Sequence, residues 1–131
     1  MEEKMDLIVC VDDRMGMAFN GRRQSKDRIV CEDIVKTVQG RSVSMDGRSR
    51  KLFDGMDIRI SDDAQFCFLE FAAPSELPEP PDHIILYRWN RHYPSDVKFD
   101  LSLDKYKMTE STEFAGNSHE MITKEVYEYE K

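Results

Sequence analysis

The stretch Leu7-Ile8-Val9-Cys10-Val11-Asp12 belongs to an almost continuous apolar run that begins at Met5 and ends at an acid. A run of this length and composition is typical of a strand that is covered on both faces of its sheet. A second run, His83-Ile84-Ile85-Leu86-Tyr87, has the same character. Both runs therefore predict buried strands, and the first is expected at the centre of the sheet.

A helix is expected between these two strands. Ser25 is a residue type that favours the position before a helix, and Gly40 is typical of a helix end. Apolar residues between them recur at helical spacing, which predicts a buried stripe formed by Val30, Ile34 and Val38. The sequence therefore predicts a helix that begins near Ser25 and runs to about Val38.

The remaining segments are shorter. Residues 12–21 are rich in turn-forming types and predict a loop. The prolines within residues 72–82 exclude a regular helix or a central strand there. Strands are expected over residues 41–45, 58–60, 66–71 and 84–89, and a short helix over residues 47–53.

Two segments near the end of the chain, residues 106–114 and 121–129, loosely alternate between apolar and polar side chains. This alternation favours strands with one solvated face, and Gly116-Asn117 between them is typical of a tight turn. The two strands are therefore expected to form an antiparallel hairpin. Together the elements predict an α/β fold with a mixed sheet, few flanking helices and a single domain over residues 1–131.

The composition is that of a globular protein, with 40% hydrophobic and 34% charged residues. The formal net charge of -7 disfavours nucleic acid as a partner, although a local basic patch can still bind an anion. No apolar run approaches the ~20 residues of a membrane-spanning helix, and no signal peptide is recognised. Cys10, Cys31 and Cys67 are widely spaced among apolar neighbours, which favours reduced thiols and a cytoplasmic location.

Several of these segments resemble the dihydrofolate reductases in their order and spacing. They are the first strand, the loop with Gly16-Met17 and Asn20-Gly21, the helix that opens around Asp27, and the part of the chain from His83 onward. The resemblance implies a dihydrofolate reductase-like mixed sheet. It also implies a carboxylate that binds a pterin, and binding elements for NADPH.

Asp27 is the candidate catalytic residue. It is expected in the first turn of the helix, with Cys31, Ile34 and Val38 on its own face, so it lies at the edge of a buried apolar surface. The matching acid of the dihydrofolate reductases binds the pterin, and the resemblance gives Asp27 that role. The alternative is an acid that is favoured by the helix dipole alone, which stabilises by ~0.3–1 kcal/mol.

The segment before Asp27 departs from the family. Dihydrofolate reductases usually carry Pro-Trp and a second proline there, whereas this chain has Gly21-Arg22-Arg23-Gln24-Ser25-Lys26. Two guanidinium groups, an amide and a hydroxyl at a helix start favour phosphate or carboxylate. Arg22, Arg23, Gln24 and Ser25 are therefore candidate ligand-binding residues, and the alternative is a solvated loop whose arginines pair with surface acids.

The cofactor elements are altered as well. Met45 followed by Gly47-Arg48-Ser49 is similar to the family's phosphate-binding helix start, so Arg48 and Ser49 are the candidate cofactor-binding residues. The family's Gly-Gly pair is missing, and Glu70-Phe71 follows the matching strand. A carboxylate and larger side chains hinder a pyrophosphate there. The helix and strand that normally lie between these two elements are deleted, so NADPH is disfavoured and the cofactor stays unknown.

The segment Trp89-Asn90-Arg91-His92-Tyr93-Pro94 occupies the place where the family closes its substrate site. Aromatic rings interleaved with arginine suit a nucleobase-like ligand, so Trp89, Asn90 and Arg91 are further candidate ligand-binding residues. The alternative is that Trp89 and Tyr93 cap the core while the polar residues form a turn.

Metal and nucleophile chemistry has little support in the sequence. His83, His92 and His119 are isolated, and the His-x-His-x-Asp-His zinc signature of ribonuclease Z is absent, which excludes that enzyme. No Ser-His-Asp or Cys-His arrangement stands out from the spacing of the residues.

Two functions follow from these observations. The first is non-redox binding of a small anionic or nucleotide-like ligand in a cleft beside the first helix, with a protein partner as a further option. The second is an NADPH-dependent reductase of a pterin-like substrate in which the cofactor docks differently, near Arg48 and Ser49. The first is favoured because the Gly-Gly pair, the Pro-Trp pair and the intervening segment are all lost together.

Overall fold

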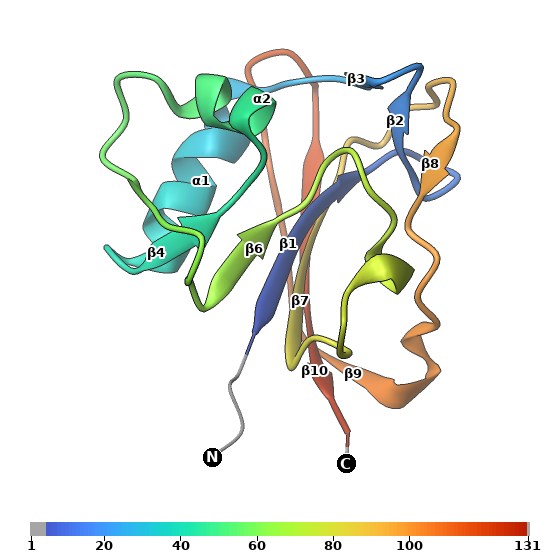
Figure 1. Cartoon of the computed structure of the whole chain (residues 1–131). Coiled ribbons are helices and arrows are strands. Elements are labelled where there is room, and N and C mark those ends of the chain that lie inside the picture. The colour runs from blue at the N-terminus through green and yellow to red at the C-terminus, as the bar shows by residue number, and fades with distance from the viewer. Residues whose placement is uncertain (1–4, 131) are drawn as a thin grey trace.

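The computed structural model describes residues 5–130, which form a mixed seven-stranded sheet with helices packed beside it (Figure 1). Its strand order is β5-β4-β6-β1-β7-β10-β9. The strands are β1 (Asp6–Val11), β4 (Ser42–Ser44), β5 (Arg59–Ile60), β6 (Phe66–Phe68), β7 (His83–Arg88), β9 (Tyr106–Phe114) and β10 (Ile122–Tyr129). As predicted, β1 lies at the centre of the sheet, and it pairs in parallel with both β6 and β7. The mixed α/β architecture is thus confirmed.

A second, smaller sheet was not predicted. It has the order β3-β2-β8 and consists of β2 (Gly16–Phe19), β3 (Arg22–Arg23) and β8 (Val97–Lys98). The prediction of a loop over residues 12–21 is therefore wrong for its second half. Asn20 and Gly21 do adopt turn conformations, with φ of 54° and 72°. They form the turn between β2 and β3.

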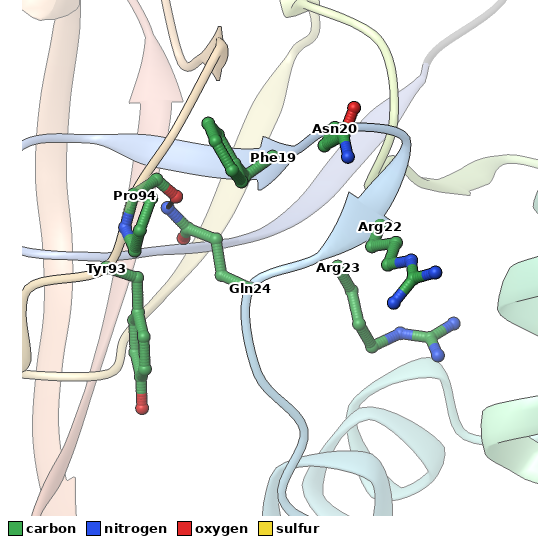
Figure 2. A pocket seen from close by; sticks show the side chains of 7 residues that line it. All are labelled: Phe19, Asn20, Arg22, Arg23, Gln24, Tyr93 and Pro94. Atoms are coloured by element: carbon green, nitrogen blue, oxygen red, sulfur yellow. Dashed lines mark hydrogen bonds between the residues drawn. The ribbon is translucent and has the colours of Figure 1, made fainter.

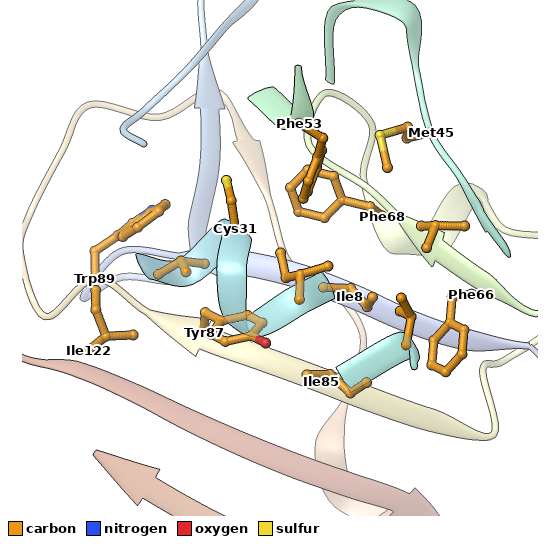
Figure 3. Close-up of a cluster of buried hydrophobic side chains, with 14 residues drawn as sticks. Ile8, Cys31, Met45, Phe53, Phe66, Phe68, Ile85, Tyr87, Trp89 and Ile122 are labelled. Atoms are coloured by element: carbon orange, nitrogen blue, oxygen red, sulfur yellow. The ribbon is translucent and has the colours of Figure 1, made fainter. Parts of the chain in front are cut away.

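Helix α1 (Arg28–Val38) packs on one face of the large sheet. Its buried residues are Val30, Cys31, Ile34 and Val38, which confirms the predicted stripe. They meet Ile8, Ile85, Tyr87 and the aromatic residues Phe66, Phe68 and Trp89 in one apolar cluster (Figure 3). The helix ends where Gln39 and Gly40 take left-handed backbone angles.

The predicted start of this helix is wrong by two residues. Asp27 caps α1, because its carboxylate accepts a hydrogen bond from the backbone N–H of Ile29 at 2.9 Å. Ser25 lies in the segment before the cap, and its hydroxyl is free for other contacts. Aspartate and serine cap helices equally well, so local propensity does not choose between them.

The opposite face of the sheet has its own core. Leu7, Val9 and Val11 alternate with Ile8 along β1 and point to this second face. Met17 of β2 and Phe99, which follows β8, pack against them. The small sheet and the segment after it therefore cover the face that α1 leaves open.

The hairpin of β9 and β10 is confirmed, but its connection is longer than the predicted tight turn. Residues 115–121 join the two strands, and this segment, here called the hairpin loop, reaches the start of α1. Short helices complete the fold: α2 (Gly47–Arg50), η1 (Lys51–Phe53), η2 (Pro74–Glu76) and η3 (Leu103–Lys105).

Between η1 and β6 the described chain contains the two-residue strand β5 and no helix. Cys10, Cys31 and Cys67 are all free thiols. Across residues 5–130, no helix combines the length and the apolar character needed to cross a membrane.

Candidate functional site

Asp27 joins the start of α1 to the hairpin loop. Besides the Ile29 amide, its carboxylate accepts hydrogen bonds from the backbone N–H of Asn117 at 3.0 Å and of Ser118 at 2.8 Å. The Nδ1 atom of His119 lies 3.0 Å from its Oδ2. The residue is 2% exposed. These four contacts occupy all the hydrogen-bond acceptor sites of the carboxylate. A pterin can therefore bind Asp27 only if the hairpin loop moves away.

The hairpin loop approaches Asp27 closely because residue 116 is a glycine. A Cβ atom at Gly116 would collide with the Asp27 carboxylate and crowd the carbonyl oxygen of His119. The backbone amides of the next two residues are thereby free to point at the carboxylate oxygens. The sequence Gly116-Asn117-Ser118-His119 thus forms a small cup of donors around one buried acid.

The Asp27 carboxylate stays ionised over the ordinary pH range. Burial raises its pKa, but the hydrogen bonds from the Asn117 amide, the His119 ring and the Ser118 and Ile29 amides outweigh burial and lower the pKa to about 2. An ionised carboxylate only accepts hydrogen bonds, so Nδ1 of His119 carries a proton. In neutral His119 the other ring nitrogen, Nε2, is then a bare acceptor.

Two hydroxyl groups meet this acceptor. The Oγ of Ser25 lies 3.1 Å from Nε2 of His119, and the Oη of Tyr93 lies 3.0 Å from it. The two oxygens are 3.3 Å apart. The ring of Trp89 stacks on the His119 ring, with centroids 4.6 Å apart and planes at 20°. We call Ser25, Asp27, Trp89, Tyr93 and His119 the histidine cluster.

A pH dependence of stability follows from the lowered pKa of Asp27. The stabilisation by its carboxylate is complete above the ordinary pKa of 3.8 and is lost as the pH falls through about 2. We expect wild-type protein to lose unfolding free energy over this window more steeply than Asp27→Asn protein, in urea unfolding at stepwise pH. Every other carboxylate is present in both proteins, so parallel curves would contradict the assignment.

A basic cleft of about 660 Å³ opens beside the histidine cluster. It contains five cationic side chains, one aromatic ring and two hydroxyl groups. Its lining residues are Gly21, Arg22, Arg23, Ser25, Lys26, Arg48, Lys51, Phe71 and Ser118. Of the predicted ligand-binding and cofactor-binding residues, the cleft brings together Arg22, Arg23, Ser25 and Arg48.

The carboxylate of Glu70 lies beside the cleft and binds two of the predicted site residues, Arg23 and Ser49. Glu70, half-buried after β6, accepts two hydrogen bonds from the Arg23 guanidinium, at 3.0 and 3.1 Å. It also accepts the hydroxyl of Ser49 at 2.7 Å, and Ser49 is completely buried. The hydroxyl that the resemblance assigns to a cofactor phosphate is therefore turned inward to Glu70.

Arg48 lies across the cleft from β3. Its guanidinium contacts Asp46 and donates to the carbonyl oxygen of Gly21 at 2.9 Å. It also lies over the ring of Phe71, 3.8 Å from the centroid, which is a close cation–π contact. Arg48 therefore links α2 to Gly21, the residue directly before β3, at the rim of the cleft.

A second cavity of about 390 Å³ lies on the other side of Arg22 and Arg23, and Figure 2 shows the residues around it. Gln24 lines it, and its side-chain nitrogen donates to the carbonyl oxygen of Pro94 at 3.1 Å. Among the residues that the structure describes, the Oε1 of Gln24 is the buried side-chain oxygen without a hydrogen-bond partner. This cavity is smaller and holds fewer cations than the basic cleft.

The other predicted ligand-binding residues line neither cavity. Trp89 is 4% exposed and serves the histidine cluster. Asn90 has a φ of 59°, and its side-chain amide donates to the Met121 carbonyl oxygen and the Thr123 hydroxyl, both at 3.0 Å. Arg91 is exposed outside both cavities. Trp89 and Asn90 thus hold the hairpin loop in place.

Several site residues escaped the sequence reasoning. His119 was treated as isolated, and Lys26, Phe71 and Ser118 were not chosen. His119 is 92 residues from Asp27 in the chain, so no local spacing joins them. The usable signal was the cluster of polar residues after Gly116, which is longer than a tight turn needs. In the described part of the chain, no group of three or more metal-ligand side chains gathers.

Comparison with known proteins gives one kind of match. No protein-family model matches the chain, and no curated protein sequence is similar to it. A solved structure, the dihydrofolate reductase from Enterococcus faecalis complexed with NADP(H) and RAB-propyl, superposes with a TM-score of 0.67. The match covers 98% of this chain and 97% of that chain at 9% sequence identity. The chain therefore has a dihydrofolate reductase-like fold.

Proposed function

We propose that this protein binds a small anionic or nucleotide-like ligand in the basic cleft and does not transfer hydride. The observation that carries the proposal is the concentration of five cationic side chains around Phe71, in a chain whose formal net charge is -7. The cations are Arg22, Arg23, Lys26, Arg48 and Lys51. A local positive field on an acidic surface favours phosphate or carboxylate groups.

Three of the five cations are available to a ligand. Among residues 5–130, no carboxylate lies within 4.0 Å of the charged groups of Arg22, Lys26 or Lys51. Arg23 and Arg48, in contrast, are partly neutralised by Glu70 and Asp46. Ser25 and Ser118 add hydroxyl groups, and Phe71 adds an apolar surface. This set suits a phosphate joined to a flat ring.

The reductase alternative is disfavoured on two grounds. Asp27 is saturated by hydrogen bonds from its own chain, so it offers no free oxygen to a pterin. Glu70 lies beside the place where a cofactor phosphate is expected and already holds the Ser49 hydroxyl. A carboxylate there repels a pyrophosphate.

Arg22→Ala tests the proposal. A hydrogen bond to a charged group contributes about 1.5–3 kcal/mol, so the substitution is expected to weaken nucleotide binding roughly 10- to 100-fold. The measurement is calorimetric titration with adenosine 5′-monophosphate and with inorganic phosphate. Arg22 is exposed and pairs with no acid in the described chain, so the stability of the unliganded protein should stay unchanged.

Arg59→Ala is the matched control. Arg59 is also an exposed arginine in a two-residue strand, but it lies outside the basic cleft. The control should bind like wild-type protein. Equal binding by wild-type, Arg22→Ala and Arg59→Ala proteins would exclude the basic cleft as the site.

A further inference from the structure

We propose that Ser25, His119 and Asp27 form a hydrolytic centre in which Ser25 is the nucleophile, and that its substrates are carboxylic esters of anionic compounds. The choice of an anionic substrate rests on the proposed function of the basic cleft. The assignment of the nucleophile rests on the geometry of the histidine cluster alone.

The three side chains have the order of contacts that activates a serine. Asp27 Oδ2 lies 3.0 Å from Nδ1 of His119, and Nε2 of the same ring lies 3.1 Å from the Oγ of Ser25. A base within hydrogen-bond distance of the hydroxyl and an acid that orients the base are what a serine nucleophile requires. Because Asp27 fixes the proton on Nδ1, Nε2 faces Ser25 as an acceptor.

The burial of the three residues matches these roles. The side chains of His119 and Asp27 are 1% and 0% exposed, and Trp89 stacks on the imidazole. The base is therefore held in one orientation. Ser25 is half-buried and lines the basic cleft, so a substrate in the cleft can reach its oxygen. A buried relay that ends at an accessible hydroxyl differs from an ordinary core hydrogen-bond network.

Tyr93 is the second hydroxyl at the centre. Its Oη is 3.3 Å from Ser25 Oγ and 3.0 Å from Nε2, so it competes with Ser25 for the same acceptor. When the Tyr93 hydroxyl instead donates to Ser25 Oγ, the Ser25 proton is directed to Nε2. We therefore assign Tyr93 as a positioning residue, and Ser25 as the residue that forms the covalent bond.

The reaction balances with water as the only co-reactant. Ser25 Oγ attacks the ester carbonyl carbon while its proton passes to Nε2 of His119. The bond from this carbon to the leaving oxygen then breaks, and the leaving alcohol takes the proton from Nε2. Water, deprotonated by His119, attacks the acyl–Ser25 ester, and the proton returns to Ser25 Oγ as the acid departs. The cations of the cleft favour the negative charge that develops on the carbonyl oxygen.

Labelling with diisopropyl fluorophosphate tests the nucleophile directly. This neutral probe phosphorylates activated serines, with loss of fluoride, and needs no contact with the cations of the cleft. We expect wild-type protein to gain one adduct, which peptide mass spectrometry assigns to Ser25. Ser25→Ala protein should gain none, and Ser111→Ala, which removes an exposed serine of β9, should label like wild-type protein.

Two substrates complete the test: 4-nitrophenyl acetate and the anionic mono-4-nitrophenyl succinate. We expect Ser25→Ala to reduce hydrolysis of both to the uncatalysed rate, whereas Tyr93→Phe slows the labelling of Ser25 without abolishing it. Absence of an adduct on wild-type protein, or an adduct on Tyr93 or Ser118, would overturn the proposal.

The two proposals fail separately. Intact nucleotide binding without labelling of Ser25 would overturn the hydrolytic centre alone. Labelling of Ser25 without nucleotide binding, and without a preference for the succinate ester, would overturn the anion site and the substrate class.

Discussion

Replacement of Asp27 by asparagine is expected to lower the free energy of unfolding by about 3–5 kcal/mol, because each oxygen of the ionised carboxylate accepts two hydrogen bonds and a hydrogen bond to a charged group contributes about 1.5–3 kcal/mol. The asparagine amide group presents N–H donors to a cup of donors formed by Asn117, Ser118 and His119. The His119 contact is buried and the two amide contacts are partly buried, and donors among them lose their acceptor. In a domain of this size the melting temperature should fall by roughly 10–20 °C, measured by circular dichroism.

Asp13→Asn is the control for this substitution. Asp13 is an exposed acid, so its replacement should change the melting temperature by only a degree or two, the effect of a surface substitution of about 0.5 kcal/mol or less. A carboxylate kept free for a ligand costs stability in the unliganded protein, and its removal is neutral or stabilising. An unchanged or raised melting temperature of Asp27→Asn would therefore contradict the structural role and revive the pterin site.

Trp89→Ala is expected to have an effect of similar size. Trp89 is 4% exposed, packs in the cluster between α1 and the sheet, and stacks on His119. Truncation of a buried tryptophan costs about 3–5 kcal/mol, because the cavity is filled only partly by its neighbours. Urea unfolding followed by circular dichroism measures this loss. The stack on His119 is lost as well, so labelling of Ser25 should slow.

Trp89→Phe separates packing from ligand binding. A phenyl ring retains most of the apolar area and a face for His119, so this variant should recover much of the lost stability. It should also bind nucleotide like wild-type protein, because Trp89 lines neither cavity. Nucleotide binding that fails in Trp89→Phe while stability is retained would assign Trp89 to the ligand instead.

The fold was predictable where apolar residues form continuous runs or recur at helical spacing. The continuous apolar runs of β1 and β7 identified the central strands, and the spacing of Val30, Ile34 and Val38 identified the buried face of α1. The small sheet escaped prediction because its strands have two to four residues and depend on pairing between β2 and β8, far apart in the chain. Such pairing leaves no periodic pattern in segments of two to four residues.

The site was less predictable than the fold. Arg22, Arg23 and Ser25 were chosen from local chemistry and Arg48 from the resemblance, and all four line one cleft. The role of Asp27 depends on the hairpin loop, which contacts it closely because residue 116 is a glycine. No short sequence motif encodes where the hairpin loop lies in the folded chain, so the contact between His119 and Asp27 could not be predicted from their spacing in the sequence.

The sequence predicts that the cofactor elements of the resemblance are altered, and the structure shows the contacts of one residue on which this prediction depends. Glu70 was expected to hinder a pyrophosphate. In the structure it also binds Arg23 and the hydroxyl of Ser49, the group that the resemblance assigned to a cofactor phosphate. At 9% identity the match shows the fold, and the fold alone does not transfer an activity.

The most direct test of the central claim is calorimetric titration of the wild-type and Arg22→Ala proteins with four ligands. The ligands are adenosine 5′-monophosphate, inorganic phosphate, NADPH and dihydrofolate. The account predicts that adenosine 5′-monophosphate and phosphate bind wild-type protein, that Arg22→Ala weakens both, and that dihydrofolate does not bind. Tight binding of NADPH and dihydrofolate together, unchanged in Arg22→Ala, would contradict it and identify the protein as a reductase.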